Sequence, residues 1–259
     1  MITDISGSDH KLVKETAALK EKKYRERYGA FVVEGAMSVL WALQSSYSVK
    51  SIVISRDFVP PESIKAYFED VPVYRVPPHV FSKMADTKTP QGILCVCALP
   101  PAQCSPTQGL FLYCDNVRDP GNLGSIIRSA DALGFDGVLL SPGCVDPFGP
   151  KLVRSTMGSL FHITLIGDVD ADALRTMQKS GFSLIVSALG QDAVAPEAIG
   201  SLQNAVVAVG NEANGVSEAT LSAADQIVTI PMAGSAESLN VAAAAAILLY
   251  EIAKKGGRL

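Results

Sequence analysis

The chain has 259 residues, of which 48% are hydrophobic and 19% charged, and this composition is typical of a globular protein with one large domain or two smaller ones. Its longest apolar run, residues 241–250, is about half as long as a membrane-spanning helix, and the N-terminus lacks the apolar region of a secretory signal. The five cysteines are an odd number, and the three histidines are widely separated. We therefore expect reduced thiols in a cytoplasmic protein, without membrane contact and without a metal site.

The net charge of −4 is unevenly distributed. Residues 1–108 carry 13 basic and 11 acidic side chains, whereas residues 109–259 carry 9 basic and 15 acidic ones. The basic excess begins near the N-terminus, where it indicates either a solvated helix or a face that contacts a phosphate backbone. On the second interpretation the candidate contacts are Lys22, Lys23, Arg25 and Arg27.

The N-terminal part predicts a small α/β domain over residues 1–99. We expect a polar helix over 11–28 and a strand that turns into a helix within 31–43. Strands at 51–55 and 71–76 lie on either side of a helix near 62–69, and a further strand follows at 92–99. Residues 100–108 contain three prolines and predict a linker between two domains.

The remaining residues, 109–259, predict a parallel sheet covered by helices on both faces, because apolar strands alternate with helices. The expected strands are 110–114, 137–140, 162–166, 184–188, 205–209 and 226–230, and the expected helices are 123–133, 150–159, 171–179, 217–224 and 238–255. Ligands of such sheets bind at the carboxyl ends of the strands. Polar, glycine-containing sequence follows three of these strands.

The first such loop reads DNVRDPGNLGSIIRSADALG, residues 115–134. It has neither the GxGxxG pattern of dinucleotide-binding proteins nor the lysine of a P-loop. Asn122 is either a helix cap or a ligand contact, and Arg128, in the second turn of the helix, is either a surface cation or an anion-binding group.

The second and third loops are AVVAVGNEANGVSE, residues 205–218, and IVTIPMAGSAESLNVAAAAAILLYEI, residues 227–252. Glu212 lies where a buried strand ends, just before an Asn-Gly turn. Ser238 and Asn240 precede an alanine-rich helix that permits close packing. Taken singly, Glu212 is more typical of a solvated loop glutamate than of a functional one, and Ser238 is typical of a helix cap.

In their order and spacing, the three loops resemble the motifs of the SpoU/TrmH family of the SPOUT superfamily, which are RNA ribose 2′-O-methyltransferases. The resemblance covers nearly all of residues 109–253. The N-terminal half, with RYGAFVVEGAMSVLWAL and TKTPQGILCVCAL, is similar to the family's smaller RNA-binding domain, which has a fold like that of ribosomal protein L30e. The resemblance implies a parallel-sheet SPOUT domain with a deep trefoil knot, S-adenosylmethionine in the knotted crevice, and a homodimer formed through this domain.

The resemblance also implies roles for individual residues. The polar catalytic positions are Asn122, Arg128, Glu212, Ser238 and Asn240. The cofactor pocket is expected to involve Gly210, Ile230, Leu239, Met232, Ser187, Ala188, Asn211 and Gly215. Arg128 is also expected to contact RNA. Because arginine side chains stay protonated in proteins, we expect Arg128 to stabilise the developing alkoxide and not to act as the base. The proton would then pass to Glu212, a phosphate oxygen or water.

The expected function is therefore methyl transfer from S-adenosylmethionine to a ribose 2′-hydroxyl, a group that DNA lacks. The separate N-terminal domain favours 23S ribosomal RNA as the substrate. A tRNA methyltransferase and a catalytically silent RNA-binding or ribosome-assembly factor remain open as alternatives. A nucleotide-dependent oxidoreductase is disfavoured because the sequence lacks GxGxxG.

Overall fold

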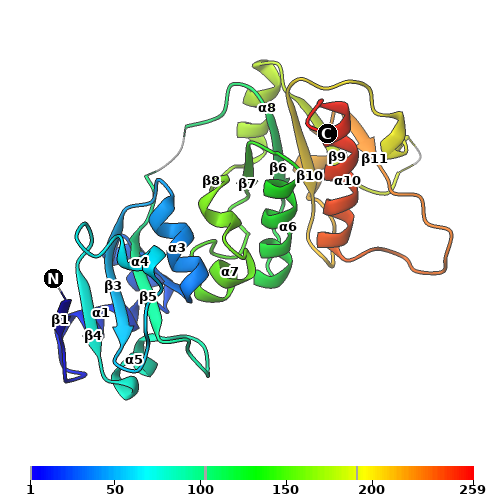
Figure 1. Cartoon of the computed structure of the whole chain (residues 1–259). Helices are drawn as coiled ribbons and strands as arrows, with labels where there is room; N and C mark the ends of the chain where they lie inside the picture. Colours follow the sequence, from blue (N-terminus) through cyan, green and yellow to red (C-terminus); the bar gives the residue numbers. More distant parts are fainter. Residues whose placement is uncertain (1, 102–103, 191) are drawn as a thin grey trace. The chain divides into compact units, whose positions relative to one another are not determined.

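The computed structural model describes residues 2–101, 104–190 and 192–259, which form two compact units (Figure 1). The first unit runs to Pro101 and also contains Asp146–Phe161, and the second contains the rest of the described chain. The segment Asp146–Phe161 lies within the predicted second domain in sequence but packs with N-terminal residues. Residues 102 and 103 of the predicted linker lie outside the described residues.

The first unit is built on a mixed sheet with the strand order β1-β4-β3-β5-β2. Its strands are β1 (Ile2–Asp4), β2 (Ala30–Glu34), β3 (Val49–Ser55), β4 (Val73–Val76) and β5 (Ile93–Ala98). Its helices are α1 (Lys11–Ala18), α2 (Lys22–Tyr28), α3 (Ala36–Gln44), α4 (Glu62–Lys65), α5 (Pro78–Met84), α7 (Pro150–Ser155) and the 3-10 turn η1 (Ser159–Phe161). Strand β5 is antiparallel to both β2 and β3, and Val53, Leu94 and Phe81 belong to the core of this unit.

The structure divides the predicted helix over 11–28 into α1 and α2, and Arg25 hydrogen-bonds to the backbone at the break. The Arg25 guanidinium donates hydrogen bonds to the carbonyl oxygens of Leu19 (2.7 Å) and Lys20 (2.8 Å), which are freed where α1 ends. It also forms an ion pair with Asp146, and the residue is only 5% exposed. The structure therefore contradicts the assignment of Arg25 as an RNA contact, because its donors are already used inside the unit.

The second unit contains a fully parallel sheet with the strand order β11-β9-β10-β6-β7-β8, which confirms the predicted fold class. Its strands are β6 (Leu110–Cys114), β7 (Gly137–Leu140), β8 (Thr164–Ile166), β9 (Ser183–Ser187), β10 (Ala205–Val209) and β11 (Gln226–Val228). Its helices are α6 (Pro120–Ala132), α8 (Ala171–Lys179), η2 (Pro196–Ala198), α9 (Glu218–Leu221) and α10 (Val241–Lys255). Helix α10 packs beside α6 (Figure 1).

The strand order of this sheet reverses at one place. From β6 the chain continues outward through β7 and β8, whereas β10, β9 and β11 lie on the other side of β6. Parallel sheets form a crevice at the carboxyl ends of the strands where the order reverses. Here that position is occupied by Asp115, after β6, and Gly210, after β10. No helix in the described part of the chain is long and apolar enough to cross a membrane.

Candidate active site

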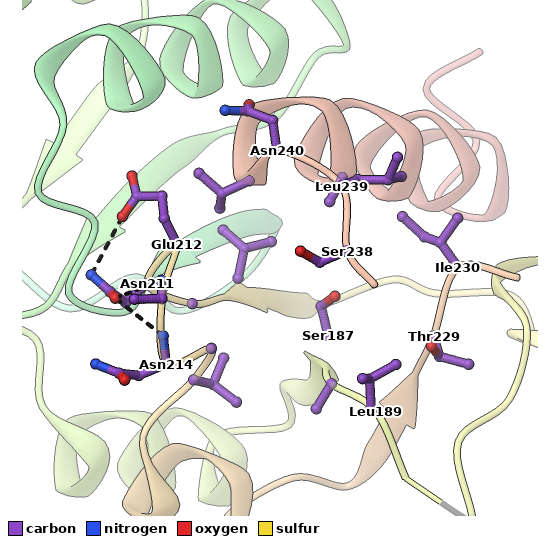
Figure 2. Close-up of a pocket in the computed structure, with 18 of the residues that line it drawn as sticks. Ser187, Leu189, Asn211, Glu212, Asn214, Thr229, Ile230, Ser238, Leu239 and Asn240 are labelled. Carbon is purple, nitrogen blue, oxygen red and sulfur yellow. Dashed lines mark hydrogen bonds between the residues drawn. The ribbon is translucent and has the colours of Figure 1, made fainter. Parts of the chain in front are cut away.

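A cavity of about 690 Å³ opens at the carboxyl ends of β9, β10 and β11 (Figure 2). Three segments of the second unit line it: the end of β9, the loop after β10, and the long segment between β11 and α10. The cavity brings together all eight residues that the sequence analysis assigned to the cofactor, namely Gly210, Ile230, Leu239, Met232, Ser187, Ala188, Asn211 and Gly215. Glu212, Ser238 and Asn240 line it as well.

The walls of this cavity leave apolar side chains uncovered. Leu239 and Met232 are each 39% exposed, and Leu189 is 81% exposed. Exposed apolar groups in a concave site, interspersed with backbone and amide polar groups, are typical of a site for a small, partly aromatic ligand. The cavity therefore has the chemical character that an adenosine-containing molecule requires.

The loop after β10 can close only because residue 210 is a glycine. A Cβ atom on Gly210 would lie 2.1 Å from the carbonyl carbon of Gly215, which is far inside van der Waals contact. Asn211 and Gly215 exchange two backbone hydrogen bonds of 2.9 Å, and Gly215 has a positive φ of 69°. The turn thereby presents Asn211 and Glu212 toward the cavity (Figure 2).

A chain of hydrogen bonds joins the three loops at Glu212. The Asn122 side-chain amide donates to Glu212 Oε1 at 2.8 Å, and the Asn240 amide donates to Asn122 Oδ1 at 3.0 Å. Asn211 Nδ2 donates to Glu212 Oε2 at 3.3 Å and to the Asn116 carbonyl oxygen at 2.9 Å. Both carboxylate oxygens of Glu212 are thus held by amides, and the carboxylate remains exposed at the cavity.

The capping interpretation does not hold for Asn122. Helix α6 begins at Pro120, and its N-cap is Asp119, whose carboxylate accepts the backbone N–H of Asn122 at 2.8 Å. The Asn122 side chain is therefore free to contact Glu212 and Asn240. In the third loop the cap of α10 is Asn240, whose Oδ1 accepts the Ala242 N–H at 2.9 Å, and Ser238 lies before the helix.

Asp115 was not among the predicted site residues, and it fixes the loop after β10 to the end of β6. Its side chain is 6% exposed, and Oδ2 accepts hydrogen bonds from Ser217 N (2.8 Å), Ser217 Oγ (2.7 Å) and Thr220 Oγ1 (2.8 Å). The signal that could have found it is an acidic residue directly after a buried strand, at a place where three polar loops converge.

The structure places Arg128 in α6, where it is exposed and does not line the cavity. Within the described chain its guanidinium has no hydrogen-bond or ion-pair partner. Arg128 is the ninth residue of α6, six positions after Asn122, and so lies in the third turn of the helix and not in the second. An exposed guanidinium without a protein partner can bind an anion.

The three other predicted RNA contacts lie in α2 and are exposed. Lys22 approaches Glu26 at 3.8 Å, Lys23 pairs with Glu21 at 2.9 Å, and Arg27 lies 5.7 Å from the centre of the Tyr28 ring. Ion pairs between exposed side chains are weak, so these contacts leave the three cations available to another partner. Their role in RNA binding stays a prediction.

The cysteines are free, and those in the core are poor nucleophiles. Burial, followed by the neighbouring Cys144, Asp115 and Glu212, raises the pKa of the Cys114 thiol well above its ordinary value. Nucleophilic catalysis by cysteine needs a lowered pKa. Among the described residues, no group of three or more His, Cys, Asp or Glu side chains could hold a metal ion.

The comparisons with known proteins agree with this geometry. The parallel-sheet α/β fold is that of the SPOUT methyltransferases. The model of the SpoU rRNA Methylase family matches residues 109–250, and the model of the MRM3-like substrate binding domain matches residues 10–95. The chain therefore belongs to the SpoU rRNA methylase family, as the sequence motifs predicted.

Similar proteins match over nearly the whole chain. The 23S rRNA (guanosine(2553)-2'-O)-methyltransferase RlmP of Bacillus subtilis is 35% identical over 248 residues, which cover 96% of this chain and 98% of that protein. The AdoMet-bound rRNA methyltransferase of Sinorhizobium meliloti is 30% identical, with a TM-score of 0.87 and 98% of each chain covered. The SpoU methyltransferase AviRb of Streptomyces viridochromogenes, in complex with AdoMet, is 27% identical with a TM-score of 0.84, covering 95% of this chain and 98% of that one.

Proposed function

We propose that this protein transfers a methyl group from S-adenosylmethionine to a ribose 2′-hydroxyl of RNA, and that the RNA is 23S ribosomal RNA. The observation that carries the proposal is the set of hydrogen bonds that converge on Glu212 from Asn122, Asn211 and, through Asn122, Asn240. These residues border a cavity at the place where the strand order reverses. The full-length similarity to RlmP supports the choice of ribosomal RNA.

The residues that line the cavity fit S-adenosylmethionine. Ile230, Leu239 and Met232 offer apolar surface to an adenine ring, and the tight turn from Gly210 to Gly215 brings backbone polar groups to the cavity edge. The Ser238 hydroxyl lies in the lining and has no hydrogen-bond partner among the residues described, so it can bind the ligand. When bound, S-adenosylmethionine supplies a sulfonium methyl group that is open to attack by oxygen.

In the reaction, a bond forms between the ribose 2′-oxygen and the methyl carbon, the carbon–sulfur bond breaks with its electron pair left on sulfur, and the hydroxyl proton is released. Holding the two reacting groups aligned can supply on the order of 7–11 kcal/mol in the best cases. We assign to Arg128 the orientation of the adjacent phosphate and stabilisation of the negative charge that develops on the oxygen. Glu212, held by two amides at the cavity, accepts the proton directly or through water.

We also infer a homodimer formed through the second unit, in the cytoplasm. Helix α10 leaves Ile247 (41%) and Tyr250 (50%) exposed on one face, which supports a protein contact there. Sedimentation velocity tests this point, since a monomer at micromolar concentration would contradict it. The trefoil knot stays a prediction.

The test of function is methylation in vitro with labelled S-adenosylmethionine, with total rRNA and total tRNA offered separately. We expect label in rRNA, and resistance of the modified linkage to alkaline cleavage. Arg128→Ala should lower the rate by about 10²–10³-fold, the usual cost of removing a group that stabilises transition-state charge. Ser125→Ala, an exposed position on the same helix, is the matched control and should keep full activity.

Two results would favour the alternatives. Label in tRNA alone would identify a tRNA methyltransferase. Absence of label in both pools, together with absence of S-adenosylmethionine binding by calorimetry, would indicate a catalytically silent RNA-binding factor.

A further inference from the structure

The first unit contains a second cavity, of about 280 Å³, that the proposed reaction does not use. It lies between the end of β3 with the turn that follows, helix α5, and the segment before β5. Its lining consists of Ser55, Asp57, Phe58, Pro78, Phe81, Ser82, Pro90, Gln91 and Gly92. The family-model match to a substrate binding domain covers this part of the chain.

One wall of the cavity is aromatic and is held in place by a glycine. Gly92 has a φ of +93°, and a Cβ atom there would lie 2.8 Å from Cβ of Phe58. This close approach seats Phe58, which is half-buried, against the backbone that enters β5. Phe81, 1% exposed, lies deeper in the lining. Two aromatic side chains, Phe58 and Phe81, therefore line this cavity.

The polar side chains of this lining are held in place by hydrogen bonds but keep donors and acceptors that are not used within the described chain. Gln91 Oε1 accepts the backbone N–H of Ala36 at 3.1 Å, which fixes the carboxamide, and both N–H donors of Gln91 lack a partner in the described chain. The Ser55 hydroxyl donates to Asp57 Oδ1, which leaves Asp57 Oδ2 as a free acceptor. The Ser82 hydroxyl donates to the Pro78 carbonyl oxygen at 3.0 Å and can still accept a hydrogen bond.

Basic side chains adjoin each side of the cavity in sequence. Arg56 precedes Asp57, Lys83 follows Ser82, and Lys88 lies three positions before Gln91. All three side chains are exposed. None of the three lines the cavity itself, and Arg56 Nη2 lies 3.8 Å from Asp4 Oδ1, so they belong to the surface beside the cavity. Cations beside an aromatic, hydrogen-bonding hollow suit the phosphates of an unpaired nucleotide whose base enters the hollow.

We propose that this cavity receives one unpaired nucleobase of the RNA substrate, and that guanine is the base it prefers. The guanine Watson–Crick edge carries two N–H donors, which suit the Asp57 carboxylate, and one carbonyl acceptor, which suits the Gln91 amide. Phe58 supplies the stacking surface. This inference rests on the proposed function, because RNA is the partner that brings the base.

The first test uses the full-length protein and the four 5′-nucleoside monophosphates. Each is titrated while the NMR signals of the Gln91 side-chain amide and of the Gly92 backbone amide are followed. We expect GMP to shift these signals at the lowest concentration. Equal shifts from all four nucleotides would overturn the preference for guanine, and the absence of any shift would overturn the site.

The second test uses two variants and a 23S rRNA transcript. Gln91→Glu keeps the oxygen that caps Ala36 but removes both donors, and Phe58→Ala removes the stacking ring but keeps Cβ. Each should weaken transcript binding by about tenfold, within the range for loss of one stacked or hydrogen-bonded base. KM for the transcript should rise while kcat and S-adenosylmethionine affinity stay unchanged. Gln44→Glu, an exposed position of the same unit, is the charge-matched control.

The outcomes separate this site from the proposed reaction. Wild-type methylation of rRNA with unchanged transcript binding by both variants would overturn the cavity and leave the reaction standing. Shifts at Gln91 with GMP and weaker transcript binding by both variants, in a protein that does not methylate RNA, would support the cavity while the reaction fails.

Discussion

Replacing Asp115 by alanine is predicted to destabilise the second unit and to weaken S-adenosylmethionine binding at the same time. Asp115 lies at the end of β6, outside the cavity lining, and acts only through the loop that it holds. Its Oδ2 accepts three hydrogen bonds, two from Ser217 and one from Thr220. Removing the carboxylate leaves these three donors without their acceptor.

The three donors do not contribute equally to the expected loss. Ser217 is exposed, so water can replace the carboxylate at both of its donors. Thr220 is 1% exposed, and its hydroxyl would keep only the Ser217 hydroxyl, at 3.0 Å, as a partner. Loss of its charged acceptor costs about 1–3 kcal/mol. A hydrogen bond to a charged acceptor contributes about 1.5–3 kcal/mol, and bonds to one atom are not additive. We therefore expect Asp115→Ala to lower the free energy of unfolding by about 3 kcal/mol and Asp115→Asn, which keeps one acceptor oxygen, by about half as much.

The assay is urea denaturation followed by two signals. Trp41 is the single tryptophan and belongs to the first unit, so its fluorescence reports that unit, whereas far-UV circular dichroism reports both. In Asp115→Ala the dichroism transition should shift to lower urea with the Trp41 transition in place. Calorimetry should show weaker cofactor binding. Asp192→Ala, an exposed position of the same unit, serves as the control.

Two results would refute this reasoning. Unchanged unfolding of Asp115→Ala would mean that the buried hydrogen bonds contribute nothing net. Lower stability with unchanged cofactor affinity would mean that the loop from Gly210 to Ser217 does not need Asp115 to hold its shape.

Three further predictions follow from individual contacts. Arg25→Met should lower the free energy of unfolding, measured by Trp41 fluorescence, by about 3–5 kcal/mol, because it leaves the Asp146 carboxylate without its buried partner. The exposed Arg27→Met should change this free energy by less than about 0.5 kcal/mol. Equal effects of the two substitutions would contradict the assignment of Arg25 to the core. At pH 8 the exposed Cys104 should react rapidly with a thiol reagent, while Cys95 and Cys114, whose pKa burial raises and whose thiolate fraction is therefore small, should react only after unfolding. Rapid labelling of Cys95 or Cys114, located by peptide mass spectrometry, would show that the core opens. Asn240→Asp should keep the cap of α10 and change the free energy of unfolding by less than about 0.5 kcal/mol. It should lower kcat/KM about tenfold, because loss of the amide donor lets Asn122 turn toward the new carboxylate and away from Glu212. Full activity of this variant would contradict a role for Asn240 in the active site.

The parallel sheet could be predicted from sequence because its signal is local. Buried strands are continuous apolar runs, and the strands 110–114 and 205–209 have the same bounds in the structure as in the prediction. Helix ends were less accurate, although a local signal existed. Pro120 is favoured at the first position of a helix, and it indicates that α6 begins three residues before the predicted Leu123, with Asp119 as the cap.

Long-range pairing is what sequence could not reveal. Arg25 reads as one member of a basic, solvated segment, and its burial depends on Asp146, which lies 121 positions away. Asp115 depends likewise on Ser217, 102 positions away. Neither pairing leaves a periodic pattern, because a single contact between distant residues imposes no repeat on the sequence around it.

The helix caps explain why the three loops can form one site. A polar residue at the start of a helix is normally used by the backbone N–H groups of the first turn. In α6 that role falls to Asp119, which leaves both ends of the Asn122 amide for Glu212 and Asn240. In α10, Asn240 uses its oxygen for the cap and its nitrogen for Asn122. The first turns of two helices are thereby hydrogen-bonded, directly or through Asn122, to one carboxylate. Movement of either turn therefore alters the position of Glu212, the group to which we assign the proton.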